Sequence, residues 1–221
     1  ASFDAWTKHY RSDENTGNAT VSYYSKGSLV ALALDLCLRR ERRGTLDGVM
    51  QHLWRSHGGP IDEADIAAAL REVGGRGYEA ELAAWVHGRD ELPLSESLDA
   101  AGVRQRSVPM PVAAALGLRL SEGPVSGVQV RSVAADSAAA QAGVAAGDEL
   151  LAVDGWRIRR LDDARQWLAV AAPFELLLVR DQRVMTLAVQ PPQPLPTSLA
   201  LGLADSPDSA AASLRRGWLG V

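Results

Sequence analysis

The chain has 221 residues, 47% of them hydrophobic and 23% charged, with a formal net charge of -4. This composition is ordinary for a soluble globular protein and allows one or two domains, each with its own core. The slightly acidic balance argues against nucleic acid or an anionic membrane as the main partner. The single cysteine, Cys37, excludes an internal disulfide, and we expect it to be buried and inert.

Residues 1–103 have the apolar periodicity of helices, which predicts an all-α lobe. The first helix is predicted from about residue 22 to residue 43, with a nearly continuous apolar run at 29–38. This run is shorter than the roughly 18–20 apolar residues of a membrane span, and Asp35 interrupts it, so we expect no membrane span. The cations of "RRERRG" and its glycine, Gly44, favour a helix end there.

Four shorter helices are predicted after the first one. Thr45 can cap "TLDGVMQHLWRSHGG", in which apolar residues recur at helical spacing. "IDEADIAAALREVGG" has acidic residues in its first turn and glycines after its end. "YEAELAAWVHG" is the fourth helix, and residues 95–101 form a short fifth. The chain begins without a methionine and without a signal peptide pattern, so we expect that it was cut from a longer protein.

The pattern changes in the second half of the chain. Residues 104–113 contain prolines and lack periodicity, which predicts a linker. Residues 114–192 contain short β-type runs and one clear helix at 161–170, which predicts a small α+β domain. Its strongest hairpin signal is "VDGW", an Asp-Gly pair between two apolar runs. The remaining residues, 193–221, are predicted to be a proline-rich tail with a short helix near 210–216.

The stretch "SAAAQAGVAAGDELLAVDG" combines a small-residue helix with a Gly147-Asp148 pair that leads into a strand and the Asp-Gly hairpin. With the strands around it, residues 114–192 resemble a bacterial PDZ domain of the kind attached to proteases. The resemblance implies β-augmentation, in which the C-terminus of a peptide or protein adds a strand to a sheet edge beside a helix. Backbone amides of a loop would hold the terminal carboxylate.

The resemblance also assigns the residues of this peptide groove. The loop is residues 115–118, the wall is the helix at 161–170, and the candidate contacts are Leu116, Gly117, Leu118, Leu161, Ala164, Arg165 and Leu168. The alternative is that the leucines belong to the core, because alternate residues of a strand must be buried. Gly117 is harder to explain in that way, since glycine weakens a strand unless another backbone approaches closely.

The first half contains "DENTGNATVSYYSKG" directly before the long apolar helix, and the chain closes with "RRGWLG". With a PDZ-like domain behind them, these stretches resemble the glycyl aminopeptidases, zinc metallopeptidases of family M61. The resemblance implies a multi-domain chain in which residues 1–103 are part of a thermolysin-like catalytic domain. The chain would be the C-terminal portion of a soluble enzyme of the bacterial cytoplasm or periplasm. Its partners would include the missing N-terminal and catalytic regions. Asn15 and Asn18 could cap helices or contact substrate, and capping is the default expectation.

The zinc site of that family comes from an H-E-x-x-H motif and a downstream glutamate. The four histidines of this chain, His9, His52, His57 and His87, form no such motif. His52 and His57 are five residues apart and therefore point to different faces of their helix. We expect no metal ligand and no cofactor in this chain, zinc in the full-length parent, and no activity of the chain alone.

Related aminopeptidases carry a Y-x-K-G motif whose tyrosine donates a hydrogen bond to the tetrahedral oxyanion. Here Tyr24, Ser25, Lys26 and Gly27 match it. A phenol suits this task because it is neutral at pH 7 and donates an O–H. Tyr23 is the rival, because consecutive helical residues point about 100° apart and only one can face the metal. Both tyrosines could instead anchor the helix start, which Lys26 and Gly27 are expected to shape.

Two functions stay open at this point. The first is the C-terminal portion of an M61-type aminopeptidase, which supplies the transition-state tyrosine and a regulatory PDZ domain. The alternative is a non-catalytic PDZ scaffold or adaptor that binds peptide C-termini. A PDZ domain of an HtrA-type serine protease is excluded, because the chain has no G-x-S-x-G-type element and its first half is helical where that protease is a β-barrel.

Overall fold

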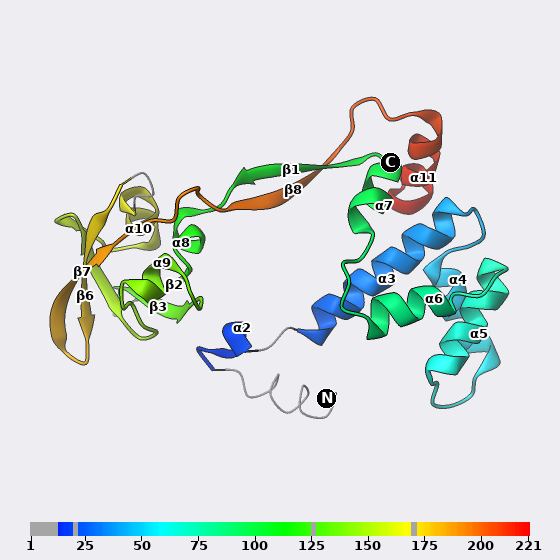
Figure 1. Cartoon of the computed structure of the whole chain (residues 1–221), viewed down its shortest axis with the longest axis horizontal. Helices are drawn as coiled ribbons and strands as arrows, with labels where there is room; N and C mark the ends of the chain where they lie inside the picture. Colours follow the sequence, from blue (N-terminus) through cyan, green and yellow to red (C-terminus); the bar gives the residue numbers. More distant parts are fainter. Residues whose placement is uncertain (1–12, 20–21, 125–126, 169–171) are drawn as a thin grey trace. The chain divides into compact units, whose positions relative to one another are not determined.

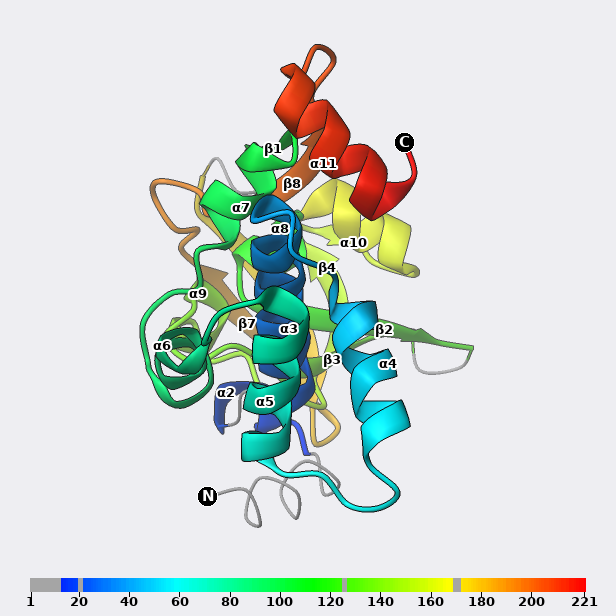
Figure 2. The same cartoon turned by 90° about the vertical axis from the view of Figure 1, so that its right-hand side faces the viewer.

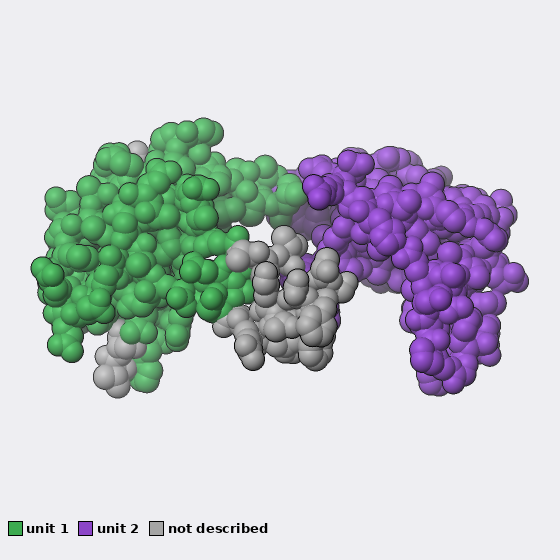
Figure 3. Space-filling model, turned by 60° about the horizontal axis from the view of Figure 1, so that its bottom comes forward, with its two compact units in different colours: residues 1–21, 107–199 green, residues 22–106, 200–221 purple. Residues whose placement is uncertain are grey.

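The computed structural model describes four stretches of the chain, namely residues 13–19, 22–124, 127–168 and 172–221. The chain divides into two compact units (Figure 3). No helix among these residues is both long and apolar enough to cross a membrane.

The first unit is β-rich and contains the described residues before 22 together with residues 107–199. The second unit is helical and contains residues 22–106 and 200–221. The prediction of a multi-domain chain with a helical part and an α+β part is confirmed. The segment from residue 200 onward, predicted as part of a tail, belongs to the helical unit.

The helical unit is built around α3, Tyr23–Arg40, which has 18 residues. The other helices of the unit gather around it (Figures 1 and 2): α4 Leu46–Ser56, α5 Glu63–Gly74, α6 Glu79–Leu82, the π-helical turn η1 Ala83–His87, α7 Leu94–Ala100 and α11 Ser209–Leu219. The five helices predicted for the first half are therefore all present, and Thr45 caps α4 as expected, because its hydroxyl accepts the Gly48 amide at 3.1 Å.

Helix α3 buries side chains on two faces, which explains its nearly continuous apolar run. One face packs against α4, α5 and α6 in a cluster of Val30, Leu34, Leu38, Val49, Leu53, Ala69, Leu70, Tyr78 and Leu82. The other face packs against α7 and α11 through Leu36, Leu98, Ala101 and Val103, with Leu214 and Trp218 at the margin. A helix that is covered on two sides needs no broad polar face.

The end of α3 differs from the prediction. The last helical residue is Arg40, and the left-handed conformation that ends the helix is taken by Arg42, with φ of 55°, rather than by Gly44. Gly44 is needed for packing instead, because a Cβ at this position would lie 2.5 Å from Cγ1 of Val73.

A polar network joins the end of α3 to the start of α6. The Arg76 guanidinium donates to the Glu41 carboxylate at 2.7 Å, and the Tyr78 hydroxyl donates to the same carboxylate at 3.0 Å. The guanidinium also lies 3.9 Å from the centre of the Tyr78 ring, at cation–π distance. These bonds, the Arg76 bonds first, lower the pKa of Glu41 to about 2. Cys37 beside the network is half-buried, and burial raises the pKa of its thiol to about 11.

The low pKa of Glu41 predicts a pH-dependent contribution to stability. In the unfolded chain this pKa is about 4.3, so the contribution is complete above about pH 5 and is lost as the pH falls toward 2. We expect Glu41→Gln to lower the free energy of unfolding by about 1–2 kcal/mol at pH 7, since solvent screens the part-exposed carboxylate. Thermal unfolding from pH 7 to pH 2.5 should show the difference from the wild type shrinking. Glu72→Gln, a change at an exposed site on α5, is the control. A constant difference at all pH values would contradict the assignment.

The β-rich unit contains an antiparallel sheet with strand order β2-β3-β4-β6-β7, and β5 pairs with β4. Its elements are α8 Val112–Ala115, β2 Leu118–Gly123, β3 Gly127–Val133, α9 Ala138–Gln141, β4 Glu149–Val153, β5 Trp156–Arg157, α10 Leu161–Trp167, β6 Phe174–Arg180 and β7 Arg183–Val189 (Figure 1). The predicted Asp-Gly hairpin joins β4 to β5, and both residues of its turn have positive φ. Residues 169–170 of the predicted helix lie outside the described residues.

Two strands lie outside this sheet. β1, Val103–Pro109, pairs with β8, Thr197–Leu203, in a two-stranded ladder (Figure 1). β1 occupies most of the segment that the sequence predicts as a linker, and β8 lies in the predicted tail. The alternation of "TSLALGL" is a strand signal that the prolines before it obscure.

Asp148 is a fully buried charge in the β-rich unit. Its two carboxylate oxygens accept hydrogen bonds from Arg180 Nε and Nη2, each at 2.7 Å, and its Oδ2 also accepts the Ala145 amide at 2.8 Å. The carboxylate thereby ties the turn before β4 to the end of β6. A buried charge is tolerated only with partners of this kind.

We expect Asp148→Asn to destabilise the β-rich unit by roughly 2–3 kcal/mol, because the neutral amide leaves the guanidinium without its bidentate partner. The free energy of unfolding by urea measures this loss. Asp162→Asn is the matched control, since the Asp162–Arg165 pair lies in solvent and should change stability by less than about 0.5 kcal/mol. Equal effects of the two substitutions would refute the special role of Asp148.

Candidate peptide groove and candidate catalytic tyrosine

The two candidate tyrosines are the first two residues of α3. Ser22 caps the helix by accepting the Ser25 amide at 3.4 Å, so the helix start predicted at residue 22 is off by one position. The rings of Tyr23 and Tyr24 lie against each other, with 4.3 Å between their centres. Tyr23 is half-buried, whereas the side chain of Tyr24 is 55% exposed.

The rest of the motif shapes the surface beside Tyr24. Lys26 Nζ donates to the carbonyls of Val86 and Gly88, each at 3.2 Å, and so ties the start of α3 to the end of η1. Gly27, one turn along from Tyr24, has no atom within 4 Å of where a Cβ would lie. The glycine therefore leaves the backbone uncovered one turn after Tyr24, at a cost to helix stability.

Of the three described histidines, His57 and His87 are paired with carboxylates, and His52 lies on α4. His57 Nε2 lies 3.0 Å from an oxygen of Asp65, and His87 Nε2 lies 2.8 Å from an oxygen of Glu63. Within the stretches that the structure describes, no three His, Cys, Asp or Glu side chains gather as a metal site would need. His9 lies outside those stretches. The described residues therefore do not fit a zinc ion.

The structure brings most of the candidate groove residues together. Helix α10 contacts β2 and α8, and one cluster contains Leu116, Leu118, Ala164 and Leu168, with Leu161 packed against it. The four residues of the cluster itself, without Leu161, are at most 4% exposed and thus form part of the core of the unit. Arg165 points outward and pairs with Asp162 at 2.9 Å, on the exposed face of α10.

The loop expected to hold a carboxylate is a helical turn, α8, followed by Gly117. The amides of Ala115, Leu116 and Gly117 already donate to the carbonyls of Pro111, Val112 and Ala114, at 2.9 to 3.0 Å. An incoming carboxylate would therefore have to compete with these bonds.

Gly117 has positive φ of 83°, and a Cβ there would lie 2.2 Å from Cβ of Ser137. Close approach to this neighbour explains the glycine without a ligand.

The outer edge of β2 remains available among the described residues, because β2 ends the strand order of the sheet. At the end of β2, Glu122 Oε2 accepts the Leu161 amide at 3.1 Å and thus joins the strand to the start of α10. Residues 122 and 161 are distant in sequence, so no local signal could reveal this bond. The site thus offers a free strand edge beside a helix, over a closed apolar floor.

Asn18 lies within the β-rich unit rather than acting as the cap that the sequence predicts. It belongs to α2, Thr16–Ala19, and its side chain donates to the Val133 carbonyl at 2.8 Å and accepts the Ala135 amide at 2.9 Å. It thus satisfies backbone groups after β3. Asn15, also expected as a cap, directly precedes α2, and its amide donates to Asp13 at 3.0 Å.

Comparisons with known proteins find a match in each half of the chain. Residues 129–180 match the model of the PDZ domain family, and residues 1–30 match the model of the M61 glycyl aminopeptidases. A Clostridium perfringens protein named as a zinc metalloprotease is 41% identical over 78 residues, which are 34% of this chain and 23% of that protein.

A solved structure resembles the chain over a longer stretch. The crystal structure of an aminopeptidase N family protein from Idiomarina loihiensis matches 96% of this chain at 29% identity, with a TM-score of 0.80. The chain spans 39% of the length of that protein. Together, these matches support an M61 peptidase with a PDZ domain.

Proposed function

We propose that this chain serves an M61-type aminopeptidase as a helical lobe of a thermolysin-like catalytic domain, within residues 1–103, and as its PDZ domain, residues 114–192. The observation that carries the proposal is the exposed Tyr24 at the start of α3, in a chain that resembles an aminopeptidase N family protein over 96% of its length. Because the phenol of Tyr24 is exposed, it can contact a peptide substrate.

In the proposed mechanism, Tyr24 donates its O–H to the oxyanion that forms when the peptide carbonyl is attacked. Tyr24 is favoured over Tyr23 because its side chain is 55% exposed, whereas Tyr23 is half-buried and stacks on it. Tyr23 and Lys26 then act as positioning residues that hold the helix start. In the full-length parent a zinc ion is expected. The described residues do not fit this ion, so the chain alone is expected to be inactive.

We expect Tyr24→Phe in the full-length enzyme to lower kcat by about 10²–10³ and to leave KM nearly unchanged, since only transition-state stabilisation is lost. Steady-state hydrolysis of a small N-terminal amino acid amide measures both constants. Tyr23→Phe is the matched control and should retain most of kcat. Normal turnover of Tyr24→Phe, or an equal loss of kcat in both variants, would contradict the assignment of Tyr24 as the oxyanion donor.

For the PDZ domain we propose capture of peptide or protein C-termini along the β2 edge, with α10 as the second wall. The free edge of β2 supports this role, because backbone pairing supplies affinity for any extended segment. The same observation supports the second candidate function, a non-catalytic scaffold. The gene sequence distinguishes the two candidate functions, since only the peptidase needs an H-E-x-x-H motif encoded before residue 1.

We expect peptides with an apolar C-terminal residue to bind the 221-residue chain weakly, because the amides of residues 115–117 must first leave their internal partners. Calorimetry with a C-terminal peptide library tests binding, and the same peptides with an amidated C-terminus are the control. Equal binding of both sets would show that the carboxylate is not recognised. Absence of heat with every peptide would count against a peptide-binding role.

A further inference from the structure

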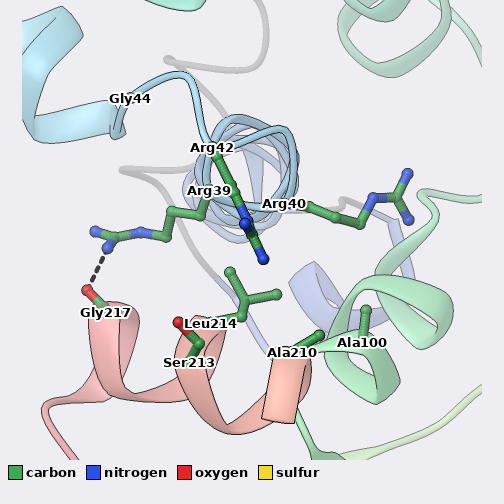
Figure 4. A pocket seen from close by; sticks show the side chains of 9 residues that line it. All are labelled: Arg39, Arg40, Arg42, Gly44, Ala100, Ala210, Ser213, Leu214 and Gly217. Carbon is green, nitrogen blue, oxygen red and sulfur yellow. Dashed lines mark hydrogen bonds between the residues drawn. The ribbon is translucent and has the colours of Figure 1, made fainter.

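A pocket of about 520 Å³ lies within the helical unit, between the end of α3 and α11 (Figure 4). The α3 side of the pocket is basic and consists of Arg39, Arg40 and Arg42. The α11 side presents a helical stripe of mostly small residues, Ala210, Ser213, Leu214 and Gly217. These small side chains leave the space open opposite the guanidinium groups.

The three arginines differ in how their charge is balanced. Arg39 Nε donates to Asp35 at 2.8 Å, and its Nη1 donates to the Gly217 carbonyl. Arg40 Nη1 donates to Glu96 at 2.7 Å. Arg42 makes no side-chain hydrogen bond or ion pair within the described residues, and its side chain lies between the other two arginines (Figure 4). Within the part of the chain that the structure describes, no carboxylate therefore pairs with this guanidinium of the pocket.

Arg42 also has an unfavourable backbone conformation for a residue with a long side chain. Its amide donates to the Arg39 carbonyl at 3.0 Å and the next amide donates to the Leu38 carbonyl at 3.1 Å, which is the Schellman motif. The residue at this left-handed position is usually glycine, because any Cβ there costs free energy.

Arg42 is unusual even within this chain. Of the other described non-glycine residues with positive φ, three are aspartates, which tolerate this conformation, and Gln182 follows one of them in the turn between β6 and β7. At position 42 the chain thus keeps a long cationic side chain where glycine would be more stable. Cations near a helix C-terminus interact favourably with the helix dipole, but a residue before the end provides this without the backbone cost.

We propose that this pocket binds a small phosphate-bearing anion, with the Arg42 guanidinium as its main charged contact. A guanidinium pairs with phosphate through two parallel hydrogen bonds, and Arg39 and Arg40 retain N–H groups that their carboxylate partners do not use. A phosphate group presents three strong acceptor oxygens to such donors, whereas a carboxylate presents two, which favours phosphate. The wall of Ala100 and Leu214 can contact an organic stem. This site is independent of the proposed peptidase function.

Calorimetric titration of the 221-residue chain tests the site, with inorganic phosphate and glycerol 3-phosphate as probes and chloride keeping ionic strength constant. We expect saturable binding, weakened at least about tenfold by Arg42→Gly. The same variant should have an unchanged or higher Tm, because glycine removes the cost of the left-handed backbone. Tighter binding of the monoester would identify organic phosphates as the ligand source, and tighter binding of the inorganic ion would identify free phosphate.

Two further variants distinguish a pocket from general charge attraction. Arg55→Ala removes the same charge from an exposed position on α4 that has no side-chain partner among the described residues, and it should bind as the wild type does. Ser213→Leu fills the pocket without changing charge and should weaken binding as Arg42→Gly does. Absence of saturable binding, equal weakening by Arg55→Ala, unchanged binding by Arg42→Gly, or a lower Tm of Arg42→Gly would overturn the proposal.

Discussion

The helical unit depends on the burial of α3 on two faces. One face of this helix completes the cluster with α4, α5 and α6, and the other completes the smaller cluster with α7 and α11. Each fully buried leucine contributes about 1.5–3 kcal/mol, so a helix that serves both clusters supplies much of the core of this unit. The start of the helix, with Tyr24, and its end, with Arg42, are therefore held on one well-packed element.

In the PDZ domain, most of the residues proposed for the peptide groove also belong to the core. Leu116, Leu118, Ala164 and Leu168 are buried, so the floor of the groove is part of the core. Backbone pairing, not side-chain pockets, is then the main interaction left for a peptide, because the edge of β2 is free. Gly117 likewise has a structural reason, since close contact with Ser137 already requires a glycine at this position of the proposed groove.

Sequence reasoning was reliable where the signal is local. The helices of the first half, the cap at Thr45 and the Asp-Gly hairpin follow from periodicity and turn chemistry, and the structure has them. It was less reliable where a distant partner decides the outcome. Gly44 was expected to end α3, yet its role is contact with Val73, and Asn18 was expected as a cap, yet it bonds to backbone after β3. The alternation of β8 was present but was obscured by the prolines before it.

The sequence by itself determined the helical and β-rich character of the two halves and the resemblance to M61 peptidases, because these rest on patterns within short windows. The tertiary structure alone decided that β1 and β8 pair and that residues 200–221 join the helical unit, since strand pairing and packing depend on contacts between distant segments. It also decided the exposure of Tyr24 relative to Tyr23, and it left the Arg42 side chain without an ion pair among the described residues. The two tyrosines, and likewise the arginines at the end of α3, are the same residue type and differ only in the side chains around them, which packing determines.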